Sequence, residues 1–259
     1  MTNLEVFDSF VLSGYDILDP SIKRKYDHSH KVATAAGIIG KSVGLDEKLS
    51  YDIGLLHDYA RFEQWKVYKS YRDNLTIDHG DLAEQMLFVD NHIEKFDVAP
   101  RDYDVVRFAV KYHNKKYVDY AAIDEFYINN DYYLDKQTFI NYCLLARDAD
   151  KQDLFIRIID CDLTMNFAGD GYTSACLTAL KEHRLVDTRD THTVLDRLFV
   201  FIGFLYDINF SVTFTLFSLD EYFNSICNRY GKDLNSEDKK LLLEVIEDFK
   251  NYYENVIRK

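Results

Sequence analysis

Most histidines of this chain lie in its first half, and several follow apolar stripes with helical spacing. The inward-facing candidates are His28, His57, His79 and His113, together with Asp58 directly after His57. His30 shares its helix face with Thr34 and Lys41, so we expect it to face solvent. An ionised Asp58 on an apolar stretch needs a counter-charge, because an unpaired buried charge is expensive. A metal cation would supply that charge. The residues alone leave two interpretations open, a metal site and a set of ordinary core histidines.

The order of these residues along the chain forms a longer pattern. Its segments are His28-Ser29-His30-Lys31-Val32-Ala33, Gly54-Leu55-Leu56-His57-Asp58, Asp78-His79-Gly80, Tyr112-His113-Asn114 and Arg147-Asp148-Ala149-Asp150-Lys151-Gln152-Asp153. This set resembles the HD-domain metal-dependent phosphohydrolase superfamily, most clearly from Tyr26 to Phe155, and within it bacterial HD-domain proteins of undefined substrate. The resemblance implies that the first metal is held by His28, His57, Asp58 and Asp150. Asp150 is favoured over Asp148 by its context. The second metal would be held by His79 and His113, with Asp58 bridging both.

The resemblance also implies an activity. We expect a phosphomonoesterase or phosphodiesterase that acts on a nucleotide or other small phosphate ester through a metal-activated hydroxide. Imidazole and carboxylate ligands suit one or two divalent ions of Mn, Fe, Ni, Co, Zn or Mg. The expected catalytic residues are Asp58, His79 and His113, and with a single metal either histidine could act as general acid or phosphate ligand. Arg61 and Lys151 are expected to bind substrate phosphate.

Three alternatives remain open at this level. An HD-fold di-iron oxygenase would use nearly the same ligands, and a non-catalytic HD module would only bind a nucleotide. An RNA-acting nuclease is disfavoured by the net charge of −13, which repels a phosphate backbone. The chain also lacks the Gly-Tyr-Pro element of the cyclic-di-GMP phosphodiesterases, so we do not expect it to hydrolyse that compound.

The elements that must position these residues are helices. With 2 Pro and 10 Gly in 259 residues, long helices run with few breaks. We expect an all-α HD-domain helical bundle with additional C-terminal helices, as a single domain over 1–259. Its metal-site core would span about 20–160 and its extension about 161–259. Helices are predicted from Asp19-Pro20 to near Gly44, after Asp46, after Asp78, from Pro100, over about 139–159 and from Ser236. The segment 115–135 is expected to be a loop or lid.

Composition gives expectations about partners and location. The net charge of −13 disfavours extended nucleic acid and is compatible with a small phosphorylated substrate that a metal or local cations hold. The C-terminal part from Thr191 onward is expected either to pack or to form the surface of a homodimer. The apolar stretch 198–217 is broken by Asp207 and Asn209, so it predicts buried helices rather than a membrane span. Four scattered cysteines without a CxxC pair, and no recognisable signal peptide, favour the cytoplasm. Trp65 and a set of tyrosines are expected to pack, or alternatively to stack a base.

Overall fold

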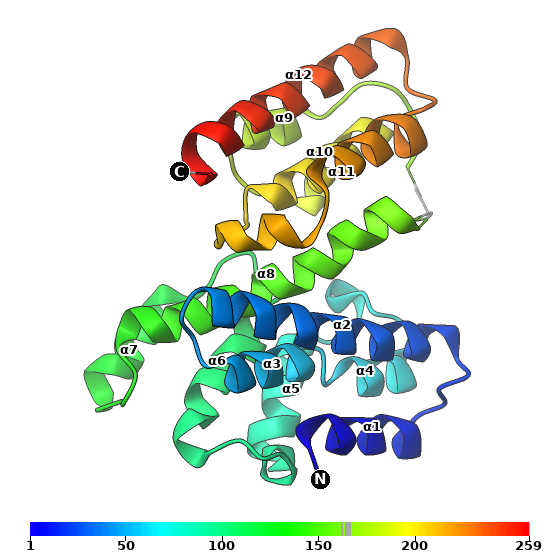
Figure 1. Ribbon diagram of the computed structural model, residues 1–259. Coiled ribbons are helices and arrows are strands. Elements are labelled where there is room, and N and C mark those ends of the chain that lie inside the picture. The colour runs from blue at the N-terminus through cyan, green and yellow to red at the C-terminus, as the bar shows by residue number, and fades with distance from the viewer. Residues whose placement is uncertain (162, 164–166, 259) are drawn as a thin grey trace. The chain divides into compact units, whose positions relative to one another are not determined.

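The computed structural model describes residues 1–161, 163 and 167–258, and within them it is built from helices without a strand. The expected all-α class is confirmed. Short 3-10 and π segments connect or extend the α-helices (Figure 1). The α-helices are α1 Asn3–Gly14, α2 Pro20–Ser42, α3 Glu47–Leu56, α4 Arg61–Tyr68, α5 His79–Glu84, α6 Tyr103–Tyr112, α7 Tyr120–Asn129, α8 Lys136–Asp160, α9 Ser174–Lys181, α10 Val194–Leu205, α11 Leu219–Ser225 and α12 Ser236–Tyr252.

The chain divides into two compact units, Met1–Asp150 and Lys151–Lys259, and the division falls inside α8. Each unit has its own buried apolar cluster. The expectation of one domain over the whole chain stays a prediction.

The helix starts in the first unit follow their predicted caps. The side chain of Asp19, which precedes Pro20, accepts a hydrogen bond from the backbone N–H of Ser21. The side chain of Asp46 accepts one from the backbone N–H of Leu49. Asp78 caps α5 in the same way. The predicted helix from Pro100 begins as a 3-10 turn, and α6 proper starts at Tyr103. These helix starts are therefore local features that the sequence specifies.

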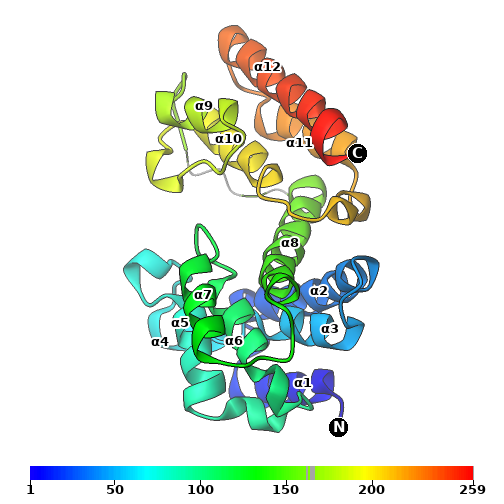
Figure 2. The same cartoon turned by 90° about the vertical axis from the view of Figure 1, so that its left-hand side faces the viewer.

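Helices α2 and α3 lie side by side, as both views show (Figures 1 and 2). Gly54 makes this approach feasible. A Cβ at this position would lie 2.7 Å from Ala36 Cβ, 2.8 Å from the carbonyl oxygen of Val32 and 2.9 Å from Ala33 Cα. The faces in contact are otherwise small and apolar, with Val32, Ala33, Ala36 and Ile53 fully buried. This packing sets the distance between His28 on α2 and His57 at the end of α3.

Two expectations about the first unit are wrong. The segment 115–135 is not simply a loop, because it contains α7. Aromatic packing holds this helix, since Phe126 lies 5.5 Å from Phe108 and 5.4 Å from Phe139 between ring centroids. His30 is only partly exposed, and its Nε2 lies 2.9 Å from Asp8 Oδ1, so it links α2 to α1.

The second unit buries α10 among α9, α11 and α12. Thr193 and Asp196 form a capping box at the start of α10, and Asp196 also accepts from the N–H and hydroxyl of Thr173. The apolar stretch 198–217 contains the end of α10 and a 3-10 segment, Ser211–Leu216, on either side of the predicted polar break. In the part of the chain that the structure describes, every helix is too short or too polar to cross a membrane.

We predict that Gly54→Ala destabilises the first unit by about 1–3 kcal/mol, because the added methyl meets backbone atoms that cannot rotate away. Urea unfolding followed by circular dichroism measures the change. Gly14→Ala is the matched control, since its added methyl would have no atom within 4 Å. A Gly54→Ala protein as stable as the wild type would contradict this account of the α2–α3 contact.

Candidate metal centre

Five side chains point inward from four helices or helix ends. His28 lies in the middle of α2, and His79 is the first residue of α5. His57 and His113 stand at the C-terminal ends of α3 and α6. Asp58 follows His57, and all five side chains are buried. The sequence expectation that these residues meet from separate helices therefore agrees with their positions.

Two histidine pairs flank one carboxylate. His28 Nε2 and His57 Nε2 lie 3.2 Å apart, and each is 3.4 Å from Asp58 Oδ2. His79 Nε2 and His113 Nε2 lie 3.0 Å apart, at 3.3 Å and 3.7 Å from Asp58 Oδ1. Each pair with its carboxylate oxygen is compact enough to hold a metal ion. Asp58 thus faces a different pair with each of its two oxygens.

The hydrogen bonds on the far side of the rings decide which nitrogens carry protons. Nδ1 of His57 lies 2.7 Å from the carbonyl oxygen of Gly54, and Nδ1 of His113 lies 2.7 Å from that of Val110. Nδ1 of His79 lies 2.7 Å from Asp73 Oδ2. These oxygens only accept, so in each of the three rings Nδ1 donates. In the neutral ring Nε2 then presents a lone pair to the centre.

Lone pairs that face one another need a cation between them. His79 and His113 present theirs at a separation of 3.0 Å, next to an anionic carboxylate. Burial lowers the pKa of His113 to about 4, so this ring does not supply the missing charge at neutral pH. An imidazole whose other N–H is held by a carbonyl or carboxylate is the usual form of a metal-bound histidine. The donor set therefore fits divalent cations.

Asp150 on α8 approaches the first histidine pair. Its Oδ1 lies 3.1 Å from His28 Nε2 and 3.8 Å from His57 Nε2, and its side chain is partly exposed. Partial burial would raise the pKa of Asp150, but the hydrogen bond from His28 holds it well below its usual range. Asp150 thus stands as an anion where a further ligand of the first metal is expected. Its role as a ligand stays a prediction.

Asp58 also remains ionised. Burial opposes its charge, but the ammonium of Lys25 holds the pKa of this carboxyl well below its usual range. Lys25 Nζ lies 2.6 Å from Asp58 Oδ2. We did not identify this lysine from the sequence, although it precedes His28 by three residues and so shares its helix face.

The two cations expected to bind substrate already have protein partners. Arg61 donates to Gln64, to the carbonyl oxygen of Tyr71 and to Asp73 Oδ1, at 2.7, 2.9 and 2.8 Å. Its Nε also lies 3.4 Å from Asp58 Oδ1. Lys151 pairs with Asp207 within the second unit, at 2.7 Å. Substrate binding by either residue stays a prediction.

Three residues support the centre in roles that the sequence analysis did not assign. Asp73 orients His79, and Asn114 Nδ2 lies 3.3 Å from Asp73 Oδ2 and 3.1 Å from Asp78 Oδ1. The buried Arg147 donates to backbone carbonyls at the end of α6, among them that of His113 at 3.3 Å. No spacing rule identifies Asp73, because it lies in a short turn outside the regular helices.

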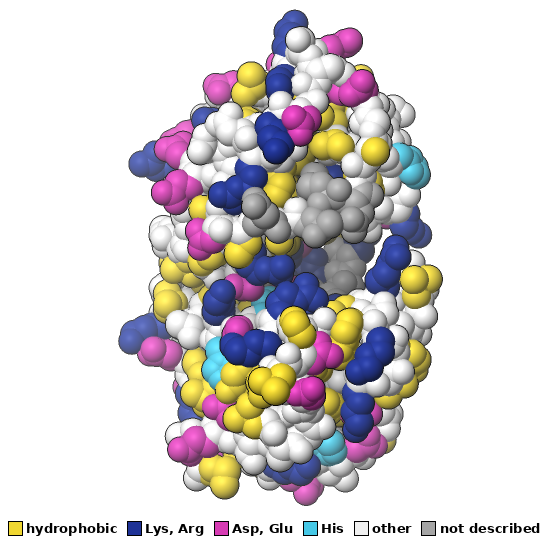
Figure 3. Space-filling model, turned by 90° about the vertical axis from the view of Figure 1, so that its right-hand side faces the viewer, with side chains coloured by type: hydrophobic (Ala, Val, Ile, Leu, Met, Phe, Trp, Pro, Cys, Tyr) yellow, Lys and Arg dark blue, Asp and Glu magenta, His cyan; other side chains and the backbone are white. Residues whose placement is uncertain are grey.

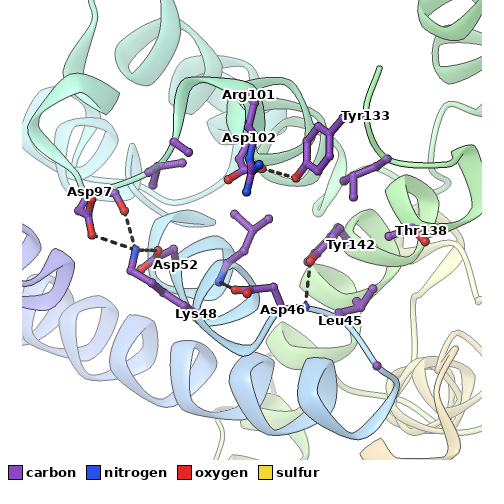
Figure 4. A pocket seen from close by; sticks show the side chains of 15 residues that line it. Leu45, Asp46, Lys48, Asp52, Asp97, Arg101, Asp102, Tyr133, Thr138 and Tyr142 are labelled. Atoms are coloured by element: carbon purple, nitrogen blue, oxygen red, sulfur yellow. Dashed lines mark hydrogen bonds and ion pairs between the residues drawn. The ribbon is translucent and has the colours of Figure 1, made fainter. Parts of the chain in front are cut away.

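A separate pocket of about 490 Å³ lies at the start of α3, away from these histidines (Figure 4). Its polar groups partner one another. Lys48 pairs with Asp52 at 3.0 Å, and Tyr142 accepts from the backbone N–H of Asp46 at 3.0 Å. The guanidinium of Arg101 stacks on the ring of Tyr133 at 5.0 Å.

The hydrogen bond between Asp73 and His79 allows a test of the second metal site, the one with His79 and His113. We predict that Asp73→Asn weakens Mn²⁺ binding by about 10–100-fold, because the neutral amide is a poorer partner for His79 Nδ1–H. Isothermal titration calorimetry measures the affinity. Asp81→Asn on the exposed side of α5 is the control. Equal affinities in the Asp73→Asn and wild-type proteins would show that this bond does not support a metal.

Comparison with known proteins agrees with this geometry. Residues 26–154 match the HD domain family, and that segment contains all six residues of the centre. Comparisons with curated proteins and with solved structures gave no match. Members of the matched superfamily are largely metal-dependent phosphohydrolases. Through residues 26–154, this chain belongs to the HD-domain superfamily.

Proposed function

We propose that the protein is a metal-dependent phosphohydrolase that acts on a nucleotide or another small phosphate ester. The observation that carries the proposal is the position of Asp58, whose two oxygens face two separate histidine pairs. Divalent ions held there would lower the pKa of bound water and neutralise charge that develops on phosphoryl oxygens. Membership of the HD superfamily supports this chemistry.

The protein's own residues would divide the work as follows. Asp58 would bridge the two half-sites, with Asp150 completing the first. His79 and His113 would hold the second, and their Nδ1 bonds keep both rings in one orientation. Since Nε2 of each ring already carries its lone pair toward the centre, no proton has to leave before a metal binds.

The substrate class is inferred from charge. A net charge of −13 disfavours long nucleic acid, whereas a small phosphate ester needs only the local positive field of the loaded centre. The four cysteines are free in the structure. This supports a reducing compartment, and we propose the cytoplasm.

We predict that Asp58→Asn lowers phosphate release by at least about 100-fold and removes bound metal from both half-sites. The amide cannot supply two anionic oxygens to two cations. The measurement is phosphate release from p-nitrophenyl phosphate, bis-p-nitrophenyl phosphate and nucleoside monophosphates with Mn²⁺, Co²⁺, Ni²⁺, Zn²⁺, Fe²⁺ or Mg²⁺, alongside metal analysis.

Asp27→Asn is the matched control, because Asp27 lies beside His28 on α2 but pairs with Lys23 at the surface. Circular dichroism checks that both variants keep their helices. Full hydrolysis by metal-free Asp58→Asn would refute the proposal. Oxygen consumption without phosphate release by the iron-loaded wild type would instead support the di-iron oxygenase. Nucleotide binding without turnover would support a binding module.

A further inference from the structure

The ammonium of Lys25 contacts Asp58 Oδ2, the same oxygen that would bind the first metal. Lys25 Nζ lies 2.6 Å from Asp58 Oδ2, and this oxygen also faces His28 Nε2 and His57 Nε2, at 3.4 Å each. A metal held by the two imidazoles and Oδ2 would lie about 2.0–2.2 Å from each ligand atom. The ammonium and the dication would then repel each other across a shared oxygen in a largely buried site.

The surroundings of Lys25 allow it to move. Its side chain is 18% exposed, whereas that of Asp58 is 2% exposed. Its Nζ also lies 5.8 Å from the ring centroid of Tyr71, whose hydroxyl is fixed on the carbonyl oxygen of Ser21. A lysine stem has four rotatable bonds and can shift its charge toward such a ring and the solvent.

The neighbouring arginine is held more firmly. Arg61 also lies near Asp58, but its guanidinium has bonds to Gln64, Tyr71 and Asp73. Figure 3 looks onto the side of the first unit that carries α4 and the first turns of α2, and Lys and Arg side chains gather there. Lys25 makes the shorter contact with the Asp58 carboxylate, 2.6 Å against 3.4 Å for Arg61.

We propose that Lys25 is the built-in counter-ion of the metal-free centre, and that metal binding exchanges its ammonium for a dication on Asp58 Oδ2. The inference rests on the metal site of the proposed function and adds a regulation of that site. The exchange is ion for ion: the Lys25–Asp58 hydrogen bond breaks, a metal–oxygen bond forms, and Lys25 keeps its proton. Lys25 thereby stabilises the empty centre and lowers its affinity for metal.

Thermodynamic linkage gives this proposal a signature that a purely structural lysine lacks. Lys25→Met removes the ammonium that competes with the metal for Asp58 Oδ2. Mn²⁺ should therefore bind about tenfold more tightly, which corresponds to the free energy of one hydrogen bond to a charged group. In EDTA the same variant should melt at a lower temperature than the wild type, because Asp58 loses its cation. With saturating Mn²⁺ the two melting temperatures should converge. Lys23→Met, two residues away in a surface pair with Asp27, should change none of these values.

A second measurement needs no variant. Lysine acetylation by acetic anhydride, followed by mass spectrometry, reports how accessible each amine is. Lys25 of the wild type should react severalfold faster in Mn²⁺ than in EDTA, with Lys23 as the internal reference. This result tests the release of Lys25 even if Lys25→Met does not fold.

Opposite results would overturn the exchange. Weaker Mn²⁺ binding by Lys25→Met, or equal destabilisation with and without Mn²⁺, would make Lys25 a structural residue. Unchanged or slower acetylation of Lys25 in Mn²⁺ would show that it stays on Asp58. None of these readouts needs turnover, so a protein that exchanges Lys25 for Mn²⁺ but hydrolyses no phosphate ester would refute the proposed function alone.

Discussion

The candidate metal centre of the first unit is built around one buried carboxylate. Asp58 is 2% exposed and remains ionised, so its charge has to be balanced inside the fold. Imidazoles from α2, α5 and the ends of α3 and α6 surround it, but the neutral rings of His57, His79 and His113 turn lone pairs rather than protons toward it. Lys25 provides the balancing charge in the protein alone, and divalent cations provide it in the proposed enzyme.

The fold positions this centre by simple means. Close packing of α2 on α3 brings His28 to His57, and Gly54 both permits the approach and supplies the carbonyl that orients His57. The same arrangement recurs at the end of α6, where Val110 orients His113. In each case a carbonyl oxygen in the last turn of the same helix fixes the orientation of the ring. The geometry of the centre is therefore largely encoded by helix ends.

This explains which parts of the structure were predictable. Helical periodicity and caps identify α2, α3, α5 and α12, since these depend on residues close in sequence. The inward direction of His28 and His79 follows from the same periodicity. Resemblance to a known pattern, rather than periodicity, directed attention to Asp150. The exposure of His30 was misjudged because its partner, Asp8, lies on a helix that the sequence did not reveal. Asp73 and α7 were missed because turn geometry and aromatic packing act between segments distant in sequence.

The central claim is that one carboxylate joins two metal ions. Electron paramagnetic resonance of the Mn²⁺-loaded wild-type protein tests it most directly, because two ions that share a bridging carboxylate couple magnetically. The account predicts an exchange-coupled dinuclear spectrum at two Mn²⁺ per chain. An isolated six-line Mn²⁺ signal at saturation, or no bound Mn²⁺, would contradict it.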